Sequence, residues 1–453
     1  MPYSPFVTTS GHRLYRQGEP YRFLGVNLFS AMHMGADGDD CGQCDRPRLI
    51  RELDRLQRLG VRNVRALASS EGPDTESWFA RTREDGLGFA DLLSMGKRPT
   101  PWRVLPSMQP SPGEYNPSLV RGLDFFIQQI ALRNMTCVLM LGNMWPWSGG
   151  FAQYVSWADE SSIPYMPPEP EGDWDRLQQY TSRFYAEPTA QSHFVAHARF
   201  VLKRVNSYTG IRYADDPAIM AWELANEPRP MRQVSSYKGW IDRVTGIVRE
   251  LAPHQLITIG TEGRTPFPKS YVGIDFYNDH DHPRIDYATV HVWPQNWEWY
   301  SPGDPNGTYA SALNKSLEYV RAHVDMAQQL NKPLVLEEFG LARDNAVHDV
   351  SGSVTWRDTY FSEMFAETLR HAEANSPLAG ANVWAWGGEG RPRRPRKPDE
   401  PLLGSHCWQV GDPLLGDPPH EAAGWYSIFD VDHTTHAAMA NLSAALARLP
   451  VDR

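Results

Sequence analysis

Eight short apolar runs alternate with helical segments along this 453-residue chain, and no other feature of the sequence restricts its fold as strongly. Each run has the length and the aliphatic composition of a buried strand. The runs are residues 23–27, 61–66, 136–141, 219–222, 255–259, 287–292, 334–338 and 380–384. Strands that alternate with helices pair in parallel through right-handed crossovers, and eight such units close into a (β/α)8 barrel.

An open, doubly wound sheet is the structural alternative, but no glycine-rich phosphate loop follows the first run. A (β/α)8 barrel typically needs about 250 residues, so the remaining length must lie in insertions. Three long segments without clear periodicity are the candidates, at about residues 68–115, 143–189 and 387–425. We therefore predict one (β/α)8 domain over residues 1–453, with long insertions in the loops that follow strands.

The composition argues against several classes of partner. A formal net charge of −10 disfavours nucleic acid or an anionic membrane as the main partner. No apolar run approaches the roughly 18 residues of a membrane-spanning helix. The amino-terminal residues lack the basic-then-apolar pattern of a secretory signal, so we expect a cytoplasmic protein. A secreted chain whose signal had been removed would look the same.

Four cysteines are present, at positions 41, 44, 137 and 407. Cys137 falls in an apolar run and is expected to be a buried thiol. Cys41 and Cys44 form a CxxC pair, which fits a redox pair, half of a zinc site or a disulfide. Because the chain has no second CxxC and the pair lies in a Gly/Asp-rich loop, we expect no metal site there.

Two stretches end a predicted strand with carboxylates. The first, at residues 219–229, reads IMAWELANEPR and carries Asn226 and Glu227 before a proline that cannot continue a strand. The second, at residues 333–340, reads PLVLEEFG and carries Glu338. Because the carboxyl ends of barrel strands share one face, folding brings the two stretches together. Two carboxylates that face one cleft are what hydrolysis of a glycosidic bond requires.

Other functional groups fall at the remaining strand ends. They are Asn27, Arg65, Asn143, Glu262, His291, Trp384 and Trp386. A single carboxylate in such a position is usually a salt-bridge partner. Two carboxylates, accompanied by amide, guanidinium and imidazole groups at other strand ends, predict a catalytic site.

Several tryptophans lie in the loops after strands rather than on a periodic face. They are Trp145, Trp147, Trp293, Trp297 and Trp299. Sugars present flat C–H faces that pack on aromatic rings, while their hydroxyls bind polar groups. Core packing is the alternative, but rings in loops at the active face have little core to enter. We therefore predict that these tryptophans line sugar subsites.

These motifs resemble those of glycoside hydrolase family 5. The segments ANEPR at 225–229 and LEEFG at 336–340 resemble its acid/base and nucleophile segments. The segments HVWPQNW at 291–297, GGFAQYVSWA at 149–158 and WGGEGRP at 386–392 look like its β-mannanase and β-mannosidase branch. The similarity extends from about residue 20 to residue 435 and implies the same barrel fold.

The resemblance implies a role for several residues. Glu227 matches the general acid/base, and Glu338 matches the nucleophile. Asn226 matches the group that holds the sugar 2-hydroxyl, and Arg65 matches the arginine beneath the nucleophile. His291 matches the sixth-strand histidine, and Trp384 matches the platform of the −1 subsite. One position departs from the family pattern. The family has a tyrosine, hydrogen-bonded to the nucleophile, two residues after the histidine. This chain has Trp293 there, and an indole N–H can donate but cannot accept a proton.

The remaining carboxylates have competing interpretations. Glu337 and Glu338 are neighbours, and successive strand residues point to opposite faces, so parity alone does not choose between them. The resemblance selects Glu338. Glu223 lies inside a strand and is expected to form a barrel salt bridge. Glu262 is a candidate subsite residue, with a structural role as the alternative.

We expect a retaining β-glycosidase that hydrolyses β-1,4-mannosidic bonds and needs no cofactor. The nucleophile must be ionised and the acid protonated, so we expect the pKa of Glu227 to lie above that of Glu338, whose pKa Arg65 would lower. Retaining chemistry places the two carboxyl groups about 5–5.5 Å apart. The insertions and the absence of an export signal favour an exo-acting β-mannosidase that trims manno-oligosaccharides. The alternatives are an endo-β-1,4-mannanase, a β-1,4-glucanase and a non-catalytic carbohydrate-binding barrel.

Overall fold

The computed structural model describes residues 4–38, 44–74, 103–167, 171–393, 395 and 412–450. At its centre is a sheet of eight parallel strands, in the order β8-β7-β6-β5-β4-β11-β10-β9. The strands are β4 (Phe23–Asn27), β5 (Asn63–Leu67), β6 (Thr136–Met140), β7 (Ile219–Glu223), β8 (Leu256–Thr258), β9 (Ala288–Val292), β10 (Leu334–Phe339) and β11 (Leu378–Val383). All are completely buried, as expected for strands covered by helices on the outside.

The two end strands of this sheet approach each other and nearly close it into a barrel. The backbone N–H of Asp286 donates to the carbonyl of Ile257 at 2.9 Å, and the hydroxyl of Thr258 donates to the carbonyl of Tyr287 at 3.0 Å. Further along, the N–H of His291 donates to the carbonyl of Glu262 at 3.0 Å. This confirms the (β/α)8 class predicted from the alternation of runs.

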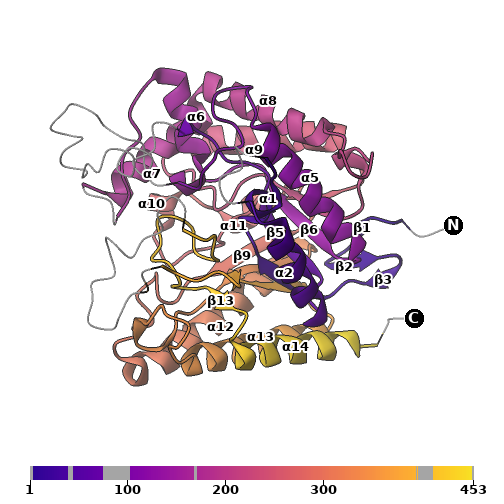
Figure 1. Cartoon of the computed structure of the whole chain (residues 1–453), viewed down its shortest axis with the longest axis vertical. Coiled ribbons are helices and arrows are strands. Elements are labelled where there is room, and N and C mark those ends of the chain that lie inside the picture. Colours follow the sequence, from indigo (N-terminus) through magenta and orange to yellow (C-terminus); the bar gives the residue numbers. More distant parts are fainter. Residues whose placement is uncertain are drawn as a thin grey trace.

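Helices surround the barrel (Figure 1). The long ones are α2 (Arg46–Arg58), α5 (Pro117–Leu132), α8 (Pro188–Lys203), α9 (Val234–Leu251), α12 (Pro305–Leu330), α13 (Thr355–Glu373) and α14 (His433–Ala447). Only the short helices α10 (Lys269–Val272) and α11 (Phe276–His280) connect β8 to β9. None of the helices in the part of the chain that the structure describes combines the length and the apolar character needed to cross a membrane.

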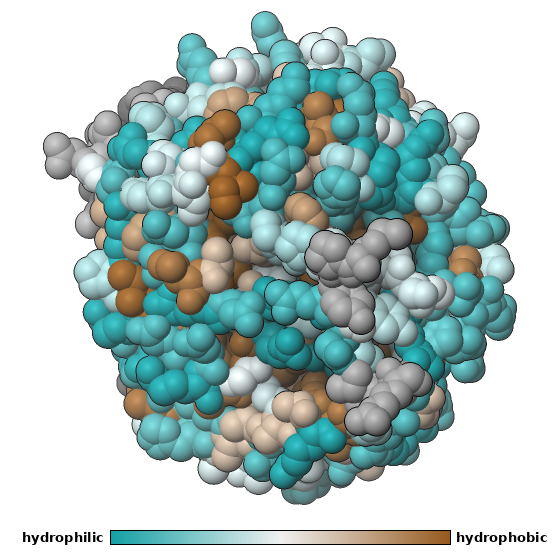
Figure 2. All heavy atoms as spheres, turned by 90° about the vertical axis from the view of Figure 1, so that its right-hand side faces the viewer, coloured by the Kyte–Doolittle hydropathy of each residue, from teal (hydrophilic) through white to brown (hydrophobic). Residues whose placement is uncertain are grey.

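The amino-terminal residues form a small antiparallel sheet that the sequence only partly predicts. Residues 12–22 predict a hairpin with Gly18 and Pro20 in its turn. Strand β2 (Arg13–Arg16) does pair with β3 (Glu19–Pro20), but Pro20 lies in β3 rather than in the turn. Strand β1 (Val7–Ser10) adds to the other edge of β2. Apolar side chains of this sheet pack with others from the barrel strands in a cluster separate from the main core. The face seen in Figure 2 is mostly hydrophilic, with apolar side chains in small separate groups.

The insertions contribute structure beside the carboxyl ends of the strands. The second insertion contains the helices α6 (Gly150–Asp159) and α7 (Trp174–Ser182). Residues 412–427 lead into β13 (Ile428–Phe429), which pairs with β12 (Trp386–Gly388). Asp417 holds this segment together, because its carboxylate accepts hydrogen bonds from the backbone N–H groups of Gly424 and Tyr426 and from the hydroxyl of Ser427. Residues 75–102 and 396–411, in the first and third insertions, lie outside the described residues.

The cysteine predictions have mixed outcomes. Cys137 is a free and fully buried thiol, as its apolar surroundings predict. Cys44 is disulfide-bonded, so it is neither a zinc ligand nor a free thiol, and its partner lies outside the described residues. Cys41 and Cys407 lie outside the described residues.

Candidate active site

The site begins with a fully buried guanidinium at the end of β5. Arg65 Nε and Nη2 donate to the two oxygens of Glu223 at 2.7 and 2.6 Å, which makes the predicted barrel salt bridge. Arg65 Nη2 also donates to Asn226 Oδ1 at 2.7 Å. Arg65 Nη1 donates to Asn27 Oδ1 at 3.1 Å and to Glu338 Oε1. The planar fork of one arginine therefore fixes side chains from β4, β7 and β10 and the turn after β7.

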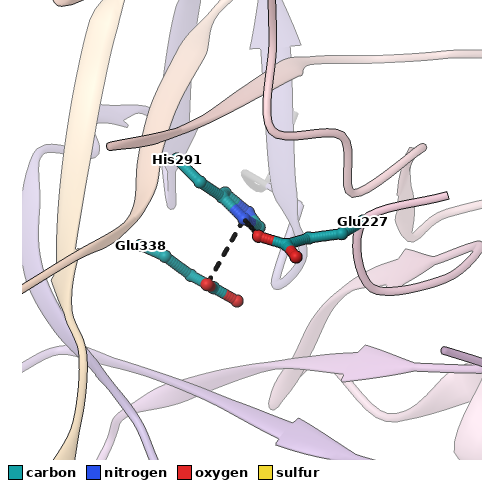
Figure 3. A group of neighbouring side chains, drawn as sticks. All are labelled: Glu227, His291 and Glu338. Carbon is teal, nitrogen blue, oxygen red and sulfur yellow. Dashed lines mark hydrogen bonds and ion pairs between the residues drawn. The ribbon is translucent and has the colours of Figure 1, made fainter. Parts of the chain in front are cut away.

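The two candidate catalytic glutamates meet at His291 (Figure 3). The imidazole Nδ1 lies 2.7 Å from Glu227 Oε1 and 3.3 Å from Glu338 Oε2. One oxygen of each carboxylate and this nitrogen all lie within 4.8 Å of one another. Glu227 and Glu338 are 7% and 2% exposed, so one nearly dry space separates them. A separation of this size fits retaining rather than inverting glycosidases.

A tight turn after β7 brings Glu227 into this space. Its φ angle is +50°, a conformation that residues other than glycine rarely adopt. Its backbone N–H donates to the carbonyl of Gly260 at 2.8 Å, and the N–H of Asn226 donates to the carbonyl of Gly142 at 2.9 Å. The side-chain amide of Asn226 donates to Asn143 Oδ1 at 3.1 Å. These contacts with two neighbouring loops hold the backbone in a conformation that is otherwise unfavourable.

A bulge in β10 changes the expectation that Glu337 and Glu338 point to opposite faces. Leu336 pairs with Val290 of β9, but the next pairing joins Glu338 to His291, so Glu337 is the extra residue. Glu337 Oε2 consequently lies 3.5 Å from His291 Nε2 and 3.6 Å from Arg65 Nε. Both glutamates face the same two cations. Glu338 has the shorter contacts and lies on the side of Glu227.

The pKa order in this ligand-free arrangement is opposite to the expected one. Burial raises the pKa of Glu338 to about 7, although His291 and Arg65 oppose the rise. Burial would also raise the pKa of Glu227, but the hydrogen bond and charge of His291, together with Arg229 and Trp145, lower it to about 2. Burial lowers the pKa of His291, but the charge of Glu338 and the bond to Glu227 raise it to about 10. The resting site therefore keeps the proton on His291, one hydrogen bond away from Glu227.

Glu227, His291 and Glu338 are also the one grouping, within the described ranges, that has the spacing of a metal site. A protonated imidazole has donors on both nitrogens and no lone pair for a metal ion. Because the pKa of His291 is raised, a metal ion at this position would have to displace a proton from the imidazole.

The predicted tryptophans separate into two groups. Trp145 Nε1 donates to Glu227 Oε2 at 2.6 Å, so this ring borders the candidate acid/base. Trp384 and Trp293 pack edge to face with ring centroids 5.8 Å apart. By contrast, Trp147 is only 2% exposed and packs edge-on against Phe29, which is the core alternative rather than an open subsite.

Trp297 is also a packed ring, since it is 8% exposed and contacts Trp299 and Tyr319 with centroids 5.0 and 5.1 Å away. Trp293 stands where the family pattern has a tyrosine, and its ring packs on Tyr426 at 5.1 Å. In the described part of the chain no hydrogen bond joins Trp293 to Glu338. Arg65 and His291 are the partners of that carboxylate instead.

Glu262 has a structural partner beside the site. Arg229 Nε and Nη2 donate to its two oxygens at 2.7 and 2.8 Å, and Arg229 Nη1 donates to Gln178 Oε1 at 2.7 Å. The guanidinium lies over the ring of Trp145, 5.1 Å from its centroid. Both oxygens of Glu262 are thus occupied, and it acts on the site through Arg229 and Trp145. This geometry favours the structural interpretation of Glu262.

Two further residues reach the site from the segment 412–427, and sequence reasoning did not find them. Glu421 is 9% exposed, and burial raises its pKa well above the ordinary range, with Asp417, Glu338 and Glu227 adding to the rise. The indole N–H of Trp384 opposes this rise as a hydrogen-bond donor, so Glu421 and Trp384 lie next to each other at the site, although Glu421 Oε2 and Trp384 Nε1 make no hydrogen bond of good geometry among the described residues. His420 stacks on Trp147, with centroids 6.5 Å apart. Neither residue follows a strand or a periodic pattern, so no local signal marks it.

A (β/α)8 barrel that holds two glutamates across a gap of this width has the architecture of a retaining glycoside hydrolase. The chain belongs to glycoside hydrolase family 5, because the family model described as GH family 5 beta-mannosidase-like matches residues 4–450. The family confirms that the chain is a glycoside hydrolase of the kind that its strand-end motifs indicate.

Individual relatives agree with this family. The chain is 31% identical over 389 residues to a putative mannan endo-1,4-beta-mannosidase 9 of Oryza sativa subsp. japonica, covering 84% of this chain and 81% of that protein. It is 34% identical to a glycoside hydrolase family 5 mannosidase from Rhizomucor miehei, with a TM-score of 0.82 and 98% of each chain covered. A mutant of that mannosidase has been crystallised with mannosyl-fructose. An endo-1,4-beta-mannanase from the same fungus shares the fold at 20% identity and a TM-score of 0.65.

Proposed function

We propose that the protein is a retaining exo-β-mannosidase that releases mannose from the ends of short β-1,4-linked manno-oligosaccharides. The observation that carries the reaction type is the meeting of Glu227 and Glu338 at one imidazole, within 4.8 Å. The mannose preference is supported by the names of the relatives, which include a mannosidase similar over 98% of the chain.

In the proposed mechanism Glu338 attacks the anomeric carbon and Glu227 protonates the departing glycosidic oxygen. Arg65 holds the attacking carboxylate in place, since its Nη1 donates to Glu338 Oε1. His291 Nδ1 lies 2.7 Å from Glu227 Oε1 and lowers the pKa of Glu227, so Glu227 has to gain its proton when substrate binds. After the glycosyl-enzyme ester forms, Glu227 removes a proton from water, and the water attacks the same carbon to release mannose. The second amide N–H of Asn226 is free to bind the sugar 2-hydroxyl, in agreement with the family pattern.

Exo action is supported by the segment 412–427, which lies against the site. His420 packs with Trp147 and with Trp174 at 6.5 and 6.4 Å, so the third insertion contacts the second insertion. Tyr426 packs on Trp293 and donates a hydrogen bond to Asn296. Internal cleavage of a polymer needs a groove open at both ends, and a loop tied to both neighbouring walls is suited to closing one of them. Glu421 Oε2 and Trp384 Nε1 lie next to each other without a hydrogen bond of good geometry, so both are suited to bind hydroxyls of a terminal sugar.

The second candidate is an endo-β-1,4-mannanase, because the plant relative with 31% identity carries that name. The early products from mannohexaose separate the two candidates. We expect mannose and mannopentaose as the only early products, measured by chromatography of samples taken while most of the substrate remains. Mannobiose and mannotriose from the start would identify endo action. Parallel assays on mannan and carboxymethyl cellulose test the β-glucanase alternative.

The pH dependence of kcat/KM follows from the groups around His291. Glu338 must be ionised to attack, and burial raises its pKa to about 7, so activity is expected to fall as the pH drops below about 7. At alkaline pH, activity is expected to fall when the proton shared by His291 and Glu227 is lost. Because the pKa of His291 is raised to about 10, this fall is expected near pH 10. A β-mannoside assayed from acid to alkaline pH measures both limbs. An acid limb near the ordinary glutamate pKa of about 4.3 would contradict this assignment.

A further inference from the structure

Two exposed aromatic rings stand beside the acid/base, although most of the site is buried. Eight large hydrophobic side chains are exposed in the described part of the chain. Only Trp174 and Phe267, which are 40% and 38% exposed, contact residues of the network around Glu227. Single exposed apolar residues are common, but exposed rings that gather beside one site often mark a binding surface.

Trp174 lies one ring away from the acid/base. It contacts Trp145 edge to face at 5.6 Å, and Trp145 donates its indole N–H to Glu227 Oε2 at 2.6 Å. On its other side Trp174 contacts His420 at 6.4 Å. The charge of Glu227 raises the pKa of His420, which places that ring in the same neighbourhood, although burial lowers the pKa more strongly. Trp174 thus connects two rings that border Glu227.

Phe267 continues this row on the far side of Trp145. The guanidinium of Arg229 lies 5.1 Å from the centroid of Trp145 and 5.3 Å from that of Phe267, so it occupies the space between the two rings. Glu262 and Gln178 hold Arg229 in place through hydrogen bonds of 2.7–2.8 Å. The row therefore rests on a buried, fixed guanidinium, and Trp145 is half-buried between two outer rings that are more exposed.

The chemistry of the reaction indicates which part of the substrate would lie along this row of rings. Glu227 protonates the oxygen of the leaving group, so the departing sugar must lie on the side of Glu227 away from Glu338. We propose that Trp174, together with Phe267 beyond Trp145 and Arg229, forms a stacking platform for the departing mannose residues, which makes this surface the aglycone subsite. This inference rests on the proposed function and extends it, because it states where the part of the oligosaccharide beyond the cleaved bond binds. Pyranose rings offer C–H faces that pack on exposed indole and phenyl rings, and their hydroxyls stay in water.

The platform predicts a substrate-dependent effect of the substitution Trp174→Ala. We expect kcat/KM for mannobiose and mannotriose to fall about tenfold, the size of one aromatic contact. β-Mannosyl fluoride has no sugar in its leaving group, so its kcat/KM should change less than about twofold, which is within the effect of a neutral surface substitution. Trp174→Phe should restore most of the loss, and Phe267→Ala should affect mannotriose more than mannobiose.

Tyr208→Ala is the matched control, because Tyr208 is 38% exposed and contacts Arg46 and Phe125, away from the site. This substitution should leave kcat/KM unchanged for all of these substrates. An equal loss on mannosyl fluoride and mannotriose would overturn the proposal, since it would mean that Trp174 only keeps Trp145 in position for Glu227. Unchanged kinetics on all substrates would overturn it as well. The products of the wild-type enzyme from mannotriose test exo action separately, so either proposal can fail while the other stands.

Discussion

Replacing Glu338 with glutamine is expected to reduce kcat/KM on β-mannosides by about 10⁴-fold or more, with oligosaccharide binding largely kept. The amide has the same shape and can still accept from Arg65 Nη1, but it cannot form the ester with the anomeric carbon. Glutamine also removes the negative charge that lies 3.3 Å from His291 Nδ1. Initial rates with mannobiose, together with calorimetric binding of mannotriose, measure the two halves of this prediction.

The neighbouring Glu337 provides a matched control for this experiment. Glu337→Gln makes the same chemical change one residue earlier, in the same bulge and beside the same two cations, at 3.5 Å from His291 and 3.6 Å from Arg65. We expect it to leave clearly measurable turnover, because Glu337 lies behind His291 rather than beside Glu227. A 2-deoxy-2-fluoro-β-mannosyl fluoride should label Glu338 in the wild-type enzyme, detected by mass spectrometry of peptides. A label on Glu337, or an active Glu338→Gln variant, would mean that Glu337 rather than Glu338 is the nucleophile.

The barrel itself could be predicted because its signal is local and repeated. Most of the eight runs are largely apolar, since helices cover the outside and side chains fill the inside. Helices with one apolar stripe separate most of these runs. The exception is the connection from β8 to β9, where α10 and α11 have only four and five residues. Such short helices carry too few turns for a periodic pattern. Strand β1 also escaped prediction, because it pairs at an edge and only one of its four residues is buried.

Only part of the site could be predicted. Residues at strand ends could be found from the sequence, whereas residues placed by strand pairing or by tertiary contacts could not. Glu227, Arg65 and His291 come from strands or from the turns that end them, so the carboxyl-end rule of barrels locates them. The inward direction of Glu337 depends on a bulge, which is a property of pairing between β9 and β10 and leaves no mark in the local pattern. Glu421 reaches the site through a loop organised by the buried Asp417, and such tertiary contacts have no periodic signature.

The tryptophans show the same division. Trp145 and Trp147 are two residues apart in one loop, and the sequence predicts subsite roles for both. A short turn of 3₁₀ helix at Pro146–Ser148 separates them in space. Trp145 reaches Glu227, whereas Trp147 packs inward on Phe29. The aromatic content of a loop therefore predicts that some rings border the site, but the turn that follows each ring decides which.

The pKa values of the two glutamates and of His291 indicate which of these groups holds the proton in the resting site. His291 carries the proton and donates it to Glu227, so Glu227 is ionised before substrate arrives. Binding of an oligosaccharide excludes water and places the glycosidic oxygen beside Glu227. In the proposed mechanism Glu227 has to gain a proton before it can act as the acid, so substrate binding must raise its pKa from the low value that His291 imposes. The glycosidic oxygen then accepts that proton as the bond breaks. Because of this order of steps, the loss of kcat/KM when Glu227 is removed should depend strongly on the leaving group.

Replacing Glu227 with alanine should therefore have effects that differ between substrates. We expect kcat/KM for mannobiose to fall about 10²–10⁴-fold, since the departing alkoxide needs a proton. For 2,4-dinitrophenyl β-mannoside, whose leaving group needs none, the first step should remain fast. Hydrolysis of the mannosyl-enzyme still needs the base, so this intermediate should accumulate and release of dinitrophenol should show a burst, recorded by stopped-flow absorbance.

Azide provides the decisive comparison for this variant. It is a nucleophile that needs no general base, and the space left by the missing carboxylate lies within reach of the anomeric carbon. Added azide should restore turnover of the dinitrophenyl substrate and yield β-mannosyl azide, because two displacements at one carbon retain its configuration. Glu262→Gln serves as control, since Glu262 is bound on both oxygens by Arg229 and should show neither burst nor rescue. An α-configured azide product would contradict the retaining mechanism, and the absence of both burst and rescue would remove Glu227 from the acid/base role.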